Sequence, residues 1–294
     1  MKETAEREHL PRALDAAEVA GQSIFTAASS PGWAGERFMP TPHARGPWDP
    51  RALHGGAPAA LITAAFERLQ PGAELRIARL GFEFLRPIPF APLALTIQIV
   101  RPGRRVQELA AELSAEPEPG STEMICRASA LRVKEIAPGV AAAVLAAPQL
   151  DSSLPPPDVA EPLVFALDDA RDDSFAATAM EMRALGDPRE PGPSRVWMRL
   201  RHPLLPGQEL TPLARLAATA DFGNGIGAAL PFDRFLFINA DLSIHLQRPP
   251  HGEWIGMHAH TLLNDGGTGL AESVLHDVHG PVGRAFQTLV VERR

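Results

Sequence analysis

A segment rich in small residues, followed by a series of candidate strands, occurs twice in this chain and constrains its fold more than any other feature. In the first half, HGGAPAALITAAFERL at 54–69 precedes alternating apolar segments between residues 76 and 133. In the second half, TPLARLAATADF at 211–222 precedes segments in the same order up to residue 293. Such repetition indicates tandem domains. The order predicts an α+β fold in which each half is an antiparallel sheet wrapped around one central helix.

Local patterns support the predicted strands. Leu80, Phe82 and Phe84 alternate along one segment and therefore share one face of a strand. In each half an Arg-Pro dipeptide, at 86–87 and at 248–249, then ends that strand before the next one begins. The two dipeptides give a register for comparing the halves.

A proline-rich stretch separates the halves. The sequence APGVAAAVLAAPQLDSSLPPPDVAEP cannot form a packed sheet or a long helix, and it is typical of a linker. We therefore expect an N-terminal domain at 1–136, a linker at 137–162 and a C-terminal domain at 163–294.

Composition limits the class of protein. Of 294 residues, 45% are hydrophobic and 21% are charged, which is typical of a globular chain. The net charge of -7 without a basic block argues against nucleic acid as a partner. The N-terminal sequence lacks the apolar core of a signal peptide, and no apolar run approaches the roughly 20 residues of a membrane span. The single cysteine, Cys126, excludes an internal disulfide and a CxxC metal site. We expect a cytoplasmic protein with no metal and no membrane span.

Several segments resemble the double-hotdog acyl-CoA thioesterases of type II and their thioesterase-like relatives. HGGAPAALITAAFE is similar to the first hotdog helix and its N-terminal turn, and GFEFLRPIPFAPL is similar to the strand pair after it. INADLSIHLQRPPHGEW and GLAESVLHDVHGPVGRAFQTLVV are similar to the family's C-terminal signature. The resemblance extends from about Phe25 to Arg293 and is weakest across the linker. It implies a tandem hotdog fold.

The resemblance also implies a function and a site. Such enzymes hydrolyse acyl-CoA thioesters, with a water held by an aspartate, a hydroxyl or amide side chain, and a glutamine of the second hotdog. In this chain these positions are Asp221, Asn239 and Gln287. The best-known members have threonine at the middle position, but an asparagine amide can also orient water because it both donates and accepts. The resemblance further implies fatty acid metabolism, coenzyme A only as part of the substrate, and pairing of chains as a homodimer.

The residues themselves leave alternatives open. Asp221 falls in the last turn of its helix, where the helix dipole disfavours a carboxylate, so a site role is plausible. The alternative is an exposed aspartate that begins the glycine-rich turn. Asn239 and Asp241 alternate with aliphatic residues and would share one face of their strand, which can also be an ordinary polar face. Gln287 lies in an apolar row and can also be a glutamine bonded to backbone.

The first half lacks this polar set. Alignment of the two Arg-Pro dipeptides pairs Ile77 with Asn239, and alignment of 127–128 with 284–285 pairs Ala130 with Gln287. We therefore expect chemistry in the second half alone.

The first half is expected to contribute to substrate binding. Gly55 and Gly56 at a helix N-terminus can either make a tight turn or leave backbone N–H groups for a ligand oxygen. We expect His54, Gly55 and Gly56 to line the acyl-CoA cleft, and Phe82 and Phe84 to line the acyl chain. His54 is not expected to act as a base.

Two other functions remain open. A hotdog enoyl-CoA hydratase or dehydratase relies on a His–Asp pair, and neither helix carries an obvious one. A non-catalytic acyl-CoA-binding module is the other, because asparagine replaces threonine at position 239.

Overall fold

The computed structural model describes residues 23–27, 35–49, 51–69, 74–118, 120–135, 153–164, 173–188 and 190–294. The N-terminal segment 1–22 and most of the predicted linker, 137–152, lie outside the described residues.

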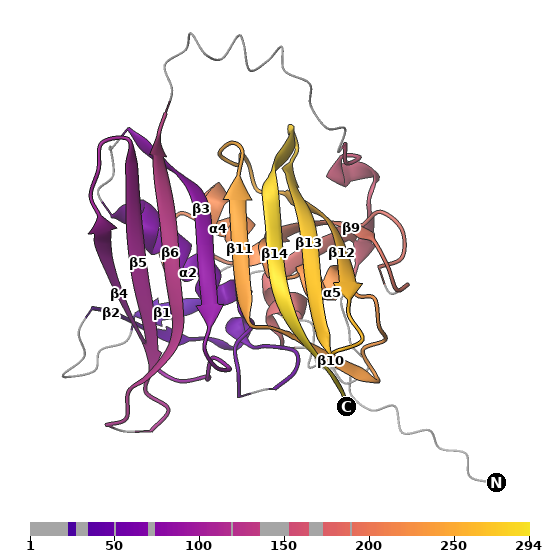
Figure 1. Cartoon of the computed structure of the whole chain (residues 1–294), viewed down its shortest axis with the longest axis horizontal. Coiled ribbons are helices and arrows are strands. Elements are labelled where there is room, and N and C mark those ends of the chain that lie inside the picture. Colours follow the sequence, from indigo (N-terminus) through magenta and orange to yellow (C-terminus); the bar gives the residue numbers. More distant parts are fainter. Residues whose placement is uncertain are drawn as a thin grey trace.

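The described strands form one 14-stranded antiparallel sheet (Figure 1). The strands of the first half are β1 (Phe25–Ala27), β2 (Glu36–Pro40), β3 (Leu75–Phe84), β4 (Leu93–Arg101), β5 (Val106–Ala115) and β6 (Glu123–Lys134). The strands of the second half are β7 (Glu161–Leu163), β8 (Met180–Ala184), β9 (Ser194–Leu200), β10 (Phe235–Asn239), β11 (Asp241–Leu246), β12 (Ile255–Leu263), β13 (Thr268–Asp277) and β14 (Gly280–Arg293). A large antiparallel sheet with few helices is therefore confirmed.

The order of the strands reflects the repeat in the sequence. It runs β1-β2-β4-β5-β6-β3 through the first half and β11-β14-β13-β12-β9-β8-β7 through the second, while β10 pairs with β14. The halves join where β3 pairs with β11, with Gly81 opposite Ser243. Because β3, the first strand after α2, pairs with β11, the second strand after α4 and α5, the two halves make one continuous sheet.

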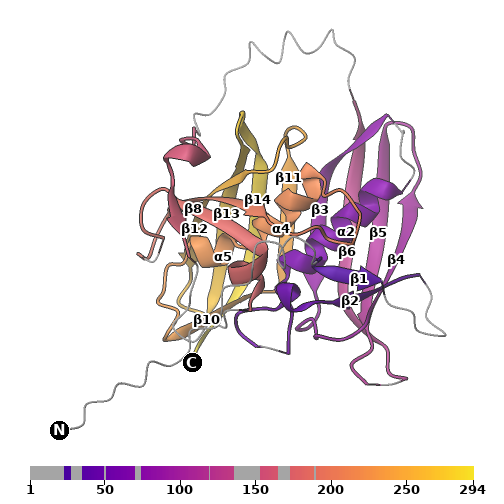
Figure 2. The same ribbon diagram turned by 180° about the vertical axis from the view of Figure 1, so that it is seen from behind.

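The helices lie on one face of the sheet, as Figure 2 shows from behind. The described helical elements are η1 (Pro42–Ala44), α2 (Gly56–Arg68), η3 (Pro157–Val159), η4 (Phe175–Ala179), α4 (Pro212–Ala220) and α5 (Gly223–Ile226). The Thr211 side chain caps α4 by accepting from the Ala214 N–H, because a threonine hydroxyl can satisfy an unpaired donor of the first turn. Helix α2 contacts α4, so the two halves meet through their helices as well as through β3 and β11. None of the described helices combines the length and the apolar character needed to cross a bilayer.

The close approach of the helices explains Gly56. A Cβ atom built on Gly56 would lie 2.5 Å from the backbone oxygen of Ala218 in α4. The Gly56 N–H also donates to His54 Nδ1 at 3.0 Å, so it is not free for a ligand. Gly56 is therefore required for packing between the halves.

Replacing Gly56 by alanine should destabilise the protein. Alanine favours a helix by about 1 kcal/mol over glycine, but the clash with a backbone atom should cost more, leaving a net loss of about 1–3 kcal/mol. Denaturant unfolding measures it. Gly266→Ala is the control, because its Cβ would meet only the end of the Asn264 side chain. Equal stability of the two variants would contradict this account.

One predicted strand is broken. The segment FLFINADLSIHL forms two strands, β10 and β11, which are separated at Ala240. Phe237 is buried before the break, and Leu242 and Ile244 are buried after it. Phe237 therefore lies on the same side of the sheet as Leu242 and Ile244, although the usual alternation would place them on opposite sides. Asn239 shares the side of Phe237, whereas Asp241, which directly precedes Leu242, lies on the other side. The prediction that Asn239 and Asp241 share a face is wrong.

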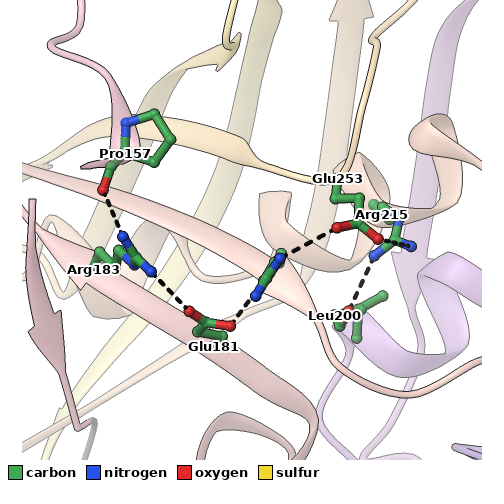
Figure 3. Close-up of polar contacts among 7 residues, drawn as sticks. Pro157, Glu181, Arg183, Leu200, Arg215 and Glu253 are labelled. Atoms are coloured by element: carbon green, nitrogen blue, oxygen red, sulfur yellow. Dashed lines mark hydrogen bonds and ion pairs between the residues drawn. The ribbon is translucent and has the colours of Figure 1, made fainter. Parts of the chain in front are cut away.

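A charged network joins β8, β9 and α4 (Figure 3). Glu181 accepts from Arg183 at 3.4 Å and from Arg199 at 2.8 Å. Glu253 accepts from Arg199 at 3.2 Å and from Arg215 at 3.3 Å. Burial acts to raise the pKa of Glu181, but the hydrogen bonds and charges of the neighbouring arginines, those of Arg199 first, outweigh it and lower the pKa. Since most of these side chains are partly exposed, each contact contributes little to stability.

Candidate functional site

A cavity of about 380 Å³ lies where the two halves meet. Both halves contribute to its lining, which consists of Gly46, Pro47, Trp48, Asp49, Ala52, Leu53, His54, Gly55, Phe84, Arg86, Pro87, Ile88, Asp221, Asn224, Ile238, Asn239, Ala240 and Val290. Its walls are largely apolar, and a few polar groups converge on Asp221. This combination is typical of a small-molecule site.

Asp221 is the buried carboxylate of this cavity. It forms the C-cap of α4, and its side chain is only 4% exposed. Its Oδ1 accepts a hydrogen bond from Asn239 Nδ2 at 2.9 Å and a longer one from Gln287 Nε2 at 3.4 Å. A buried charge is tolerated only with such partners, so neighbouring side chains compensate for its unfavourable place at a helix C-terminus.

The break between β10 and β11 brings Asn239 to Asp221. Asn239 ends β10, and its Nδ2 also lies 3.4 Å from the Asp241 backbone oxygen. The Asp241 carboxylate instead accepts from the exposed Thr288 N–H at 2.7 Å. Asn239 therefore contacts the Asp221 carboxylate at the cavity, whereas the Asp241 side chain bonds to exposed backbone elsewhere.

Gln287 lies behind Asp221 and does not line the cavity. Its side chain is buried, its Oε1 accepts from the Asn224 N–H at 2.9 Å, and its Nε2 donates to the Asp221 backbone oxygen at 3.2 Å. A Cβ on Gly223 would lie 2.7 Å from Gln287 Oε1. Asn224 and Gly223 were not among the predicted site residues, although the two glycines of GNG shortly after Asp221 are a signal of close approach.

His54 contacts Asp221 from the first half. Its Nδ1 lies 3.1 Å from Asp221 Oδ2, and the imidazole stacks on Phe222 with ring centroids 4.3 Å apart. As expected, neither helix carries a His–Asp pair within it, but His54 and Asp221 form such a pair across the two halves. His54 lies just before the N-cap of α2 and Asp221 is the C-cap of α4, far away in sequence, so only the packing of the halves brings them together.

The other predicted binding residues divide into two groups. Gly55 and Phe84 line the cavity. Gly56 packs against α4, and Phe82 is 1% exposed within the core. Trp48 lines the cavity and was missed, because a single aromatic residue in a proline-rich loop has no periodicity to reveal its direction.

The equivalent positions in the first half are apolar and buried. Ile77 is 9% exposed and Ala130 is fully buried.

The described residues contain no cluster of three or more His, Cys, Asp or Glu that could hold a metal ion.

Comparison with protein families identifies both halves. Residues 44–133 match the family model for the acyl-CoA thioesterase N-terminal domain, and residues 153–291 match that for the acyl-CoA thioesterase C-terminal domain. Together the two models match most of the chain. A search of curated proteins found no match.

Solved structures share the fold. A hot dog fold protein of unknown function from Alicyclobacillus acidocaldarius has a TM-score of 0.65 at 15% identity, covering 90% of this chain and 95% of that one. A proposed thioesterase II from Thermobifida fusca has a TM-score of 0.64 at 17% identity, covering 94% and 97%. An acyl-CoA thioesterase II from Mycobacterium marinum has a TM-score of 0.58 at 17% identity, covering 82% and 89%. At these identities the likeness shows the hotdog fold alone.

Proposed function

Because the chain belongs to the acyl-CoA thioesterase family, we propose that it hydrolyses acyl-CoA thioesters to the free acid and coenzyme A. The observation that carries this proposal is the buried Asp221 carboxylate, which lines an apolar cavity beside the Asn239 amide. A base next to an apolar chamber can activate water against a bound thioester. Coenzyme A enters only as part of the substrate.

The fold proposal is that each half is a hotdog unit with one central helix. It is supported by the contacts of α2 with β3 and β4, and by those of α4 with β9, β11, β12 and β13. The cytoplasmic location and the pairing of chains stay predictions.

In the proposed reaction Asp221 accepts a proton from a water molecule that Asn239 orients, and the resulting hydroxide adds to the thioester carbon. Gln287 holds the Asp221 carboxylate from behind. When the carbonyl re-forms, the C–S bond breaks and the coenzyme A thiolate takes the proton from Asp221. Asp221 is thereby a carboxylate again, the electron pair of the broken C–S bond stays on the coenzyme A sulfur, and no acyl-enzyme forms.

Gly55 is the proposed donor to the carbonyl oxygen. It lines the cavity at the N-terminus of α2, where backbone N–H groups are not used within the helix. Such donors stabilise the charge that develops on oxygen during addition. His54 and Gly55 thus supply the first half's polar part of the binding site, while Phe84 and Trp48 supply apolar surface for the acyl chain.

The His54–Asp221 contact favours a second candidate, hydration of an enoyl-CoA. That reaction adds water across a double bond, and a His–Asp pair in contact can activate that water as a base. The family match favours hydrolysis over this alternative.

Release of free thiol from short, medium, long and aryl acyl-CoAs tests the proposal. Thiol release with at least one class supports hydrolysis. Loss of enoyl absorbance from an enoyl-CoA, without thiol release, would instead support hydration. Binding of acyl-CoA with neither reaction would leave a non-catalytic binding module.

A further inference from the structure

The imidazole of His54 is held in one orientation beside Asp221. Its side chain is 10% exposed, and it packs against the rings of Phe222 and Phe175, whose centroids lie 4.3 and 5.0 Å away. Its Nδ1 faces two groups, the Gly56 N–H at 3.0 Å and Asp221 Oδ2 at 3.1 Å. A ring fixed by two aromatic neighbours can act on a carboxylate with little loss of entropy.

The two contacts of Nδ1 compete, because one imidazole nitrogen offers either a single lone pair or a single proton. The Gly56 N–H needs a lone pair on Nδ1, whereas a carboxylate oxygen at 3.1 Å from a lone pair would be repelled. Once Asp221 has taken a proton from water, the contact with Oδ2 becomes favourable, because that proton can lie on Oδ2 and be donated to Nδ1, or lie on Nδ1 and be donated back, and it then replaces the Gly56 N–H as the partner of Nδ1. In both states His54 fixes the orientation of Oδ2, while Asn239 and Gln287 hold Oδ1.

We infer that His54 is a positioning residue, which orients the Asp221 carboxylate and stabilises the proton that it gains from water. This inference rests on the proposed hydrolysis. The proton stays within the Asp221–His54 contact until the thiolate leaves, so the overall transfer is unchanged. Loss of this contact should lower kcat far more than it changes KM, because Phe84 and Trp48, the apolar lining for the acyl chain, are retained.

Two variants of nearly equal shape test the inference. His54→Asn keeps an amide nitrogen near the position of Nδ1 and can still donate to Asp221, whereas His54→Leu cannot. We expect His54→Asn to keep most of the wild-type kcat and His54→Leu to lose roughly 10- to 100-fold, as misplaced catalytic groups do. Equal kcat values for the two variants would overturn the inference, whether both stay active or both fail.

The same exchange at His43 is the control. His43 is also buried, but its Nδ1 lies 2.8 Å from Thr178 Oγ1. We expect His43→Asn and His43→Leu to have equal kcat values.

A second measurement does not depend on activity. In protein labelled with ¹⁵N-histidine, the His54 Nδ1 resonance should shift when Asp221 is replaced by alanine, because its partner is removed. His54→Asn identifies that resonance by its loss. An unmoved resonance would overturn the inference even if hydrolysis is confirmed, whereas absence of thiol release from any acyl-CoA would overturn the proposed function separately.

Discussion

Asp221→Asn should lower kcat for thioester hydrolysis by roughly 100-fold or more, the usual effect of removing a general base. The asparagine keeps the size of the side chain, and its oxygen can still accept from Asn239, but it cannot take a proton from water. KM should change little, since the apolar lining of the cavity is untouched. Steady-state thiol release with the best acyl-CoA, together with a thermal melt, measures both effects.

Asp241→Asn is the matched control for this variant. Asp241 lies only two residues after Asn239, yet its carboxylate accepts from the exposed Thr288 N–H. We therefore expect near wild-type kcat from Asp241→Asn. Undiminished turnover in Asp221→Asn, or an equal loss in both variants, would remove Asp221 from the chemistry.

Arg248→Ala should destabilise the protein by about 3 kcal/mol or more, because it leaves a buried charge without its ion pair. Arg248 donates to the two oxygens of Asp277 at 2.5 and 2.6 Å, and the Asp277 side chain is 0% exposed. Asp277 keeps the N–H groups of His251 and His279 at 2.9 and 2.8 Å, which limits the loss. Urea unfolding at neutral pH measures the free energy.

The same pair predicts how stability depends on pH. Burial acts to raise the pKa of Asp277, but hydrogen bonds from Arg248, His279 and His251 outweigh it and lower the pKa. A lowered carboxyl pKa stabilises the fold above the unfolded value of about 3.9, and this contribution is lost as the pH falls through the folded value. The difference in stability between wild type and Arg248→Ala should therefore be full at neutral pH and shrink below about pH 4.

Arg86→Ala is the control for Arg248→Ala. It removes the arginine of the first half's Arg-Pro dipeptide, which pairs with Glu123 at 2.6 Å where both side chains are about half exposed. Exposed pairs contribute about 1 kcal/mol or less. A similar loss of unfolding free energy in both variants would show that the burial of Asp277 does not determine how much the ion pair stabilises the protein.

Much of the fold could be predicted from the sequence, because its elements depend on local patterns. The helix capped by Thr211 follows from a Thr-Pro signal and small residues at helical spacing. The strands that contain Leu80, Phe82 and Phe84, and the hairpin after Asp277, follow from alternation and from a turn at glycine. The strand containing Asn239 was predicted in place but not its break, since a break at Ala240 leaves the alternation of residue types intact.

The sequence by itself determined the repeat, the order of the elements, the resemblance to acyl-CoA thioesterases and the candidates Asp221, Asn239 and Gln287. Only the tertiary structure decided which side chains meet. The contact between His54 and Asp221 joins the two halves, and Gly56 is needed because Ala218 lies against it. The two Arg-Pro dipeptides look alike in the sequence, but one arginine pairs with a buried carboxylate and the other with an exposed one. The physical reason is that burial and partner distance depend on residues far apart in the chain, which local patterns do not encode.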